Sequence, residues 1–110
     1  MAVVLLNAFS LNMLERKEYS IAFKPVAVEE VKETLSGGFI SYIGHQDLAS
    51  VLSSMLGVEV PVNRANYKIE PEDIVVVAQY TGPRLPEGAT KLPENASIEF
   101  WRVAIEAEEF

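Results

Sequence analysis

His45 is the residue of this chain best suited to acid–base chemistry: it is the only histidine, and there is no cysteine. The unperturbed pKa of an imidazole lies closer to neutral pH than that of any other side chain. His45 follows the short apolar stretch 39–43 and precedes a helical pattern, so we expect it where a strand ends and a helix begins. Free backbone N–H groups at a helix start favour a bound anion. On position alone, a capping or surface histidine remains the alternative interpretation.

The helix expected after His45 has one apolar face. Its apolar residues recur at i, i+3, i+4, i+7 and i+8: Leu48, Val51, Leu52, Met55 and Leu56. Asp47 stands in the first turn, where a negative side chain complements the helix dipole. Gly57 follows the last apolar residue and predicts the end of the helix.

A second junction between a strand and a helix is expected near the start of the chain. Residues 2–6 are continuously apolar, which indicates a central strand buried on both faces. Asn7, Ser10 and Asn12 follow it, and Ser10 can cap a short helical turn over residues 11–14. These residues either contact a ligand or serve as ordinary turn and cap residues.

The balance of charge narrows the possible partners. The formal net charge is −7, which argues against loose binding of DNA or long RNA, because such binding needs a basic surface. A small anionic ligand in a locally basic pocket is still compatible, and the candidate arginines are Arg16, Arg64, Arg84 and Arg102. Arg84 lies in the aperiodic segment 81–95, where its guanidinium could hold two phosphate oxygens or simply face water.

The other elements predict one α/β domain over residues 1–110. Strands are expected over 19–23 (ended by Lys24-Pro25), 39–43, 63–69, 74–78 and 97–105, with a further helix over 27–35. In the last strand the apolar positions change phase across Trp101-Arg102, which indicates a bulge or an apolar surface used in a dimer. The acidic tail 106–110 is expected to fray. We therefore predict a mixed sheet of about five or six strands with helices packed on it.

Composition indicates a soluble globular protein, with 49% hydrophobic and 23% charged residues. One histidine and no cysteine make a zinc or other transition-metal site unexpected. An all-carboxylate magnesium site stays open, although no acidic motif points to one, and we expect no cofactor. We expect a cytoplasmic protein with no membrane partner, because no signal-peptide pattern is present and no apolar run approaches roughly 18 residues.

Four segments of the chain together resemble the viral ring nuclease family, the type III anti-CRISPR proteins. They cover nearly the whole chain in order: Leu6-Asn7-Ala8-Phe9-Ser10-Leu11-Asn12-Met13-Leu14, Ile43-Gly44-His45, Asn63-Arg64 and Arg84-Leu85-Pro86-Glu87-Gly88. The resemblance implies a two-fold homodimer that uses no metal. It also implies cleavage of cyclic tetra-adenylate, the type III CRISPR second messenger, to linear di-adenylates with 2′,3′-cyclic phosphate ends. The chain departs from the family pattern at 66–67 and 81–83, which bears on ligand affinity more than on chemistry.

The resemblance also implies residue roles. The nucleophile is the substrate's own 2′-OH, so alignment and electrostatic stabilisation supply much of the rate, and a general acid adds about 10²–10⁴-fold. His45 would be that acid, Glu87 would orient it or stabilise its charge, and Arg84 would hold the scissile phosphate. The implied substrate contacts are Asn7, Ser10, Asn12, Gly44, Arg64, Gln79 and Arg84.

Three other functions stay open at this point. The chain could bind or sequester a cyclic nucleotide without cutting it. It could be a dimeric viral interaction protein with no small ligand, whose contact surface includes Phe100 and Trp101. It could also be a phosphodiesterase that acts on linear RNA or on cyclic dinucleotides.

Overall fold

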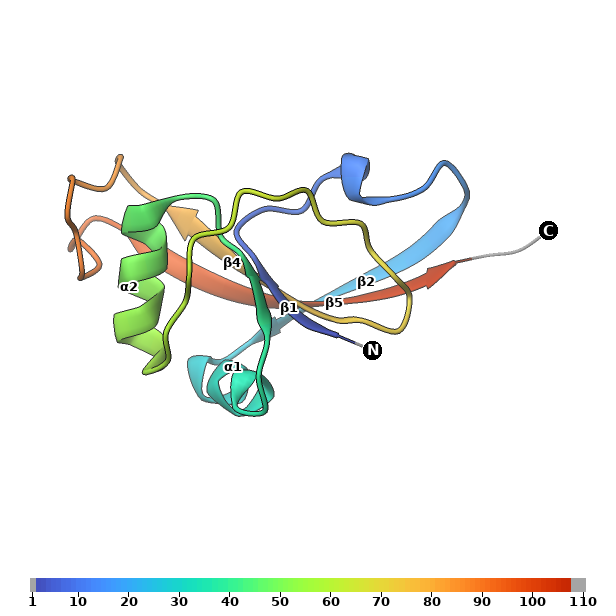
Figure 1. Ribbon diagram of the computed structural model, residues 1–110, viewed down its shortest axis with the longest axis horizontal. Helices are drawn as coiled ribbons and strands as arrows, with labels where there is room; N and C mark the ends of the chain where they lie inside the picture. The colour runs from blue at the N-terminus through green and yellow to red at the C-terminus, as the bar shows by residue number, and fades with distance from the viewer. Residues whose placement is uncertain (1, 108–110) are drawn as a thin grey trace.

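Two continuous apolar runs form the centre of a five-stranded mixed sheet in the computed structural model, which describes residues 2–107 (Figure 1). They are β1 (Val3–Leu6) and β4 (Ile74–Thr81), in the strand order β2-β5-β4-β1-β3. β1 is parallel to both β4 and β3 (Ile40–Tyr42). β5 (Ser97–Ala107) is antiparallel to β4 and to β2 (Tyr19–Val26). The single α/β domain with a mixed sheet is therefore confirmed.

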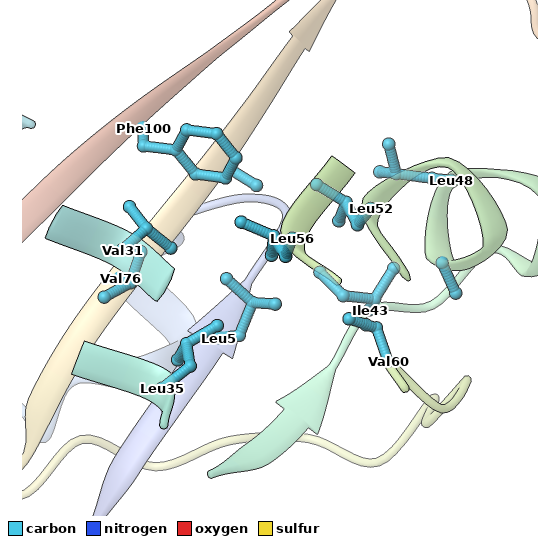
Figure 2. Packing of buried hydrophobic residues seen from close by; sticks show 12 residues of the cluster. Leu5, Val31, Leu35, Ile43, Leu48, Leu52, Leu56, Val60, Val76 and Phe100 are labelled. Atoms are coloured by element: carbon cyan, nitrogen blue, oxygen red, sulfur yellow. The ribbon is translucent and has the colours of Figure 1, made fainter. Parts of the chain in front are cut away.

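Two helices, α1 (Val28–Leu35) and α2 (Gln46–Leu56), cover one face of this sheet. Figure 2 shows how their apolar side chains meet those of the strands. The labelled residues are Val31 and Leu35 on α1, Leu48, Leu52 and Leu56 on α2, Leu5, Val76 and Phe100 on the sheet, and Ile43 and Val60 on the connecting segments. The helical periodicity thus identified the buried face of α2. α2 ends as expected, because Gly57 takes the left-handed φ of +69° that favours glycine.

Irregular chain covers the opposite face of the sheet, where a sixth strand over residues 63–69 was expected. That prediction is wrong: residues 63–69 pair with no strand, and an isolated bridge lies just before them, between Val62 and Ile43. It runs beside another irregular segment, with Ile69 N–H donating to the Met13 carbonyl at 2.9 Å. Tyr67 and Ile69 are nevertheless buried against the sheet. An extended covering segment therefore shows the same alternation of burial as a strand, without a ladder of hydrogen bonds.

β2 extends three residues beyond its expected end. Lys24-Pro25 does not break it, because Pro25 pairs with Trp101 of β5. β2 forms one edge of the sheet, and proline's missing N–H is tolerated on an edge strand because that side needs no partner.

β5 contains no bulge, since its register with both neighbours is continuous. The change of phase has a different cause: Phe100 packs under the helices, whereas Trp101 and Val103 pack on the opposite face. The first part of β5 is covered on the helix side of the sheet, and the part from Trp101 onward is covered on the opposite side. Glu106 and Ala107 pair with β2, so the expected fraying does not include them, and residues 108–110 lie outside the described part.

Within residues 2–107, no helix is long and apolar enough to cross a membrane.

Leu52→Ala is expected to lower the free energy of unfolding by about 2–5 kcal/mol, because it leaves a cavity where a fully buried side chain joins α2 to the sheet. The control is Leu11→Ala, at a side chain that is 79% exposed and should cost no more than about 0.5 kcal/mol. Chemical denaturation measures both, and equal losses would contradict the packing described.

Candidate functional site

The start of α2 places His45 at the carboxyl end of the parallel strands. His45 is the N-cap residue: its backbone carbonyl accepts the N–H of Ala49 at 2.9 Å, while its side chain makes no cap hydrogen bond. The imidazole is exposed. The N-terminus of the helix and the histidine side chain are therefore both available to a ligand.

A network around Ser41 fastens the segment after α2 beside β3. The buried Ser41 hydroxyl donates to the Pro61 carbonyl at 2.6 Å and accepts the Ile43 N–H at 3.2 Å. The Asn63 side chain donates to the Ser41 carbonyl at 2.9 Å and accepts the Ala65 N–H at 3.0 Å. These bonds replace a strand ladder and fix residues 61–65 next to the end of β3.

That network places Arg64 over the residue that precedes His45. Arg64 Nε donates to the Gly44 carbonyl at 3.0 Å, which orients the guanidinium. Within residues 2–107 neither Arg64 nor Arg84 forms an ion pair, and both side chains are exposed. Two guanidinium groups can therefore meet an anion at this site.

We call the resulting cavity of about 460 Å³ the His45 hollow. It brings together three residues singled out from the sequence: His45, Arg64 and Arg84. It also includes Asp47, Tyr80 and Leu85, to which sequence analysis assigned no site role. The segment 82–96, drawn in orange in Figure 1, lies beside α2 and supplies Arg84.

Ser10 and Asn12 lie in a different cavity of about 490 Å³, the Ser10 hollow, which also includes Asn66 and Lys68. Ser10 Oγ accepts the Asn12 N–H at 3.2 Å, which caps η1 (Leu11–Met13) as expected, and Lys68 Nζ donates to the Asn12 carbonyl at 2.6 Å. Figure 1 shows η1 well away from α2. Residues 64–68 run from one hollow to the other.

The remaining predicted residues line neither hollow. Asn7 follows β1 and is half-buried, and Gly44 takes part through its carbonyl. Gln79 faces away from the His45 hollow, because successive residues of a strand point to opposite faces and its neighbour Tyr80 lines that hollow. Glu87 is exposed and forms no hydrogen bond or ion pair with His45 in the described part of the chain.

Three residues that position the site carry weak signals in the sequence. Ser41 is the one polar residue of the stretch 39–43 apart from the tyrosine, and this isolation could have marked it. Asn63 begins the expected strand 63–69 and stands in the pair Asn63-Arg64, and neither pattern points to its hydrogen bonds. Asp47 was assigned to the helix dipole, whereas its carboxylate also accepts the Gly88 N–H at 3.0 Å.

The irregular segment that borders the Ser10 hollow is linked through Tyr67 to Ala2, the residue before β1. The Tyr67 hydroxyl donates to the Asp73 carboxylate, whose other oxygen accepts the Ala2 N–H at 3.1 Å. Burial raises the pKa of Tyr67 well above its usual range, and the hydrogen bond and negative charge of Asp73 raise it further. The Tyr67 ring also packs against Tyr42, with ring centroids 4.9 Å apart.

Among residues 2–107, no three His, Cys, Asp or Glu side chains form a cluster that could hold a metal ion.

The fold and site define a single-domain α/β protein with an arginine- and histidine-lined cavity where its parallel strands end. A family model described as STIV B116-like matches residues 3–102, and the chain belongs to this family. A similar solved structure is B116 of Sulfolobus turreted icosahedral virus, with a TM-score of 0.78 and 25% identity, over 94% of this chain and 99% of that one.

Two curated relatives are also viral proteins. The chain is 37% identical over 70 residues to uncharacterized protein 26 of Sulfolobus islandicus filamentous virus (isolate Iceland/Hveragerdi), covering 63% of this chain and 59% of that protein. It is 38% identical over 77 residues to uncharacterized protein ORF117 of Acidianus two-tailed virus, covering 67% and 63%. The matches thus span less than two thirds of each relative's length. The family is one of archaeal virus proteins.

Tyr67→Phe is expected to remove part of the pH dependence of stability in alkali. Unfolded tyrosine ionises near its ordinary pKa of 10.0, whereas folded Tyr67 keeps its proton, so its contribution is present below pH 10 and is lost as the pH rises above it. Chemical denaturation on either side of pH 10 should show that the free energy of unfolding falls more steeply with pH for wild type than for Tyr67→Phe. Tyr42→Phe is the matched control, because its hydroxyl makes no hydrogen bond within residues 2–107. Parallel pH profiles for wild type and Tyr67→Phe would contradict this account.

Proposed function

We propose that this chain is a metal-independent ring nuclease that cleaves cyclic tetra-adenylate and so switches off the CRISPR nucleases which that messenger activates. The observation that carries the proposal is the meeting of His45, Arg64 and Arg84 in one hollow at the N-terminus of α2. The four-segment resemblance to viral ring nucleases supports it independently.

The electrostatics of the His45 hollow suit a phosphodiester. The whole chain carries a net charge of −7, yet this hollow holds two unpaired guanidinium groups and the positive end of a helix dipole. A guanidinium can hold two phosphate oxygens at once. A local positive field of this kind attracts a small anionic ligand even where the protein as a whole is acidic.

The proposed reaction needs no external nucleophile. The 2′-oxygen of one ribose attacks the adjacent phosphorus and loses its proton to solvent water, the bond from phosphorus to the 5′-oxygen breaks, and a 2′,3′-cyclic phosphate forms. The leaving 5′-oxygen takes a proton from the His45 imidazolium. Arg84 stabilises the charge that develops on the non-bridging oxygens. A role of Glu87 in orienting or stabilising His45 stays a prediction, because no hydrogen bond or ion pair joins the two side chains within residues 2–107.

A two-fold dimer would explain how one ring yields two halves. Cyclic tetra-adenylate has two-fold symmetry, so two His45 hollows related by a two-fold axis would each cut one linkage and release two di-adenylates. In one protomer, Ser10 and Asn12 lie in the other hollow. They would contact the same ring either across residues 64–68 or from the second protomer.

A single-turnover assay with radiolabelled cyclic tetra-adenylate in EDTA tests this proposal. Wild type is expected to produce di-adenylates, and His45→Ala is expected to lose about 10²–10⁴-fold in rate, because it lacks the general acid. Glu33→Ala, at an exposed carboxylate on α1, is the control that should keep the wild-type rate.

The same assay separates the competing functions. Tight binding without cleavage by wild type would indicate a sensor or a sequestering protein. Absence of both binding and cleavage would overturn the proposal and favour an interaction protein without a small ligand.

A further inference from the structure

One hydrogen bond joins the middle of the segment 82–96 to the helix that begins after His45. The Gly88 N–H donates to Asp47 Oδ1 at 3.0 Å, although the two residues are 41 positions apart in sequence. Asp47 stands in the first turn of α2, where the helix dipole stabilises its negative charge. An ionised carboxylate is also a stronger acceptor than a neutral group.

The donor belongs to a tight turn that presents Glu87. The Ala89 N–H donates to the Pro86 carbonyl at 3.1 Å, and Gly88 has a φ of +80°, as the third residue of a type II turn requires. The Glu87–Gly88 peptide is the central one of this turn, and its N–H is not used by the turn's own hydrogen bond. Asp47 accepts that N–H and so fixes the orientation of the peptide that follows Glu87.

The segment has other anchors at its two ends. The Tyr80 hydroxyl donates to the Pro83 carbonyl, and Leu85 packs against the core beneath the helices. Gly82 lies so close to Ala96 that an added Cβ would stand 2.6 Å from the alanine Cβ, so the two ends of the segment are held together. Arg84 and Glu87 therefore lie between the anchors at Tyr80 and Asp47.

We propose that Asp47 is a positioning residue that holds Arg84 and Glu87 in place relative to His45. Its carboxylate lines the same hollow as two arginines, where its charge opposes an incoming phosphate. The hydrogen bond that holds the segment 82–96 explains why the Asp47 carboxylate lies in a hollow where it repels a phosphate. The proposal rests on the proposed nuclease function, and it separates two effects of Asp47: its charge and its role as an acceptor.

Three variants test the role in the single-turnover assay. Asp47→Ala removes both charge and acceptor, and misplacement of Arg84 by about 1 Å should cost on the order of 10²-fold in rate. Asp47→Asn removes the charge but keeps an acceptor oxygen, so it should recover most of the rate. Glu29→Ala removes a carboxylate from the first turn of α1 and should behave as wild type.

An NMR readout of the Gly88 amide does not depend on catalysis. Asp47→Ala should shift the Gly88 amide resonance and speed its exchange with solvent, Asp47→Asn should do so to a smaller extent, and Glu29→Ala should leave the amide as in wild type. An unchanged Gly88 amide in Asp47→Ala would overturn the anchor. A changed amide with an unchanged cleavage rate, or an equally slow Asp47→Asn, would overturn the positioning role. If wild type cleaves nothing, the nuclease proposal fails while the Gly88 amide still decides the anchor.

Discussion

The burial of β1 on both faces of the sheet, at Val4, Leu5 and Leu6, is the constraint on which the rest of this structure depends. β1 pairs with a parallel strand on each side, with β3 from Val4 to Leu6 and with β4 over its whole length. Leu5 faces the helices and Leu6 faces the opposite side, and both are buried. Each face must then be covered by apolar side chains. Two helices cover one face, and two irregular segments cover the other at the cost of separate hydrogen bonds for their backbones.

The same central strands decide where a site can form. Parallel strands end at a common edge, and ligands of α/β proteins bind preferentially there. At this edge β3 gives way to His45 and α2, and the segment after β4 carries Arg84 back beside the helix. β3 is only three residues long, so side-chain hydrogen bonds of Ser41 and Asn63, in place of backbone pairing, hold residues 61–65 beside it. These bonds position Arg64. Two of the four arginines of an acidic protein are thereby brought together in one hollow.

Much of the fold could be predicted because its signals are local. The helical spacing on α2, the glycine at its end and the apolar runs of β1 and β4 all follow from residues close together in sequence. The predictions failed where the same sequence pattern can occur in different tertiary surroundings. Tyr67 and Ile69 alternate like a strand but lie in a covering segment, Pro25 lies on an edge that tolerates it, and Trp101 begins a stretch of β5 packed on the other face.

The sequence alone determined which side chains could do chemistry, namely one histidine and a few arginines, and that the histidine would begin a helix. Only the tertiary structure decided their grouping. It joined Arg64 and Arg84 to His45, left Ser10 in a separate hollow, and bonded Asp47 to Gly88 across 41 residues. The physical reason is distance along the chain: the spacing of neighbouring residues is enough to predict the period of a helix or strand. Contacts between distant segments depend on how each face of the sheet is covered.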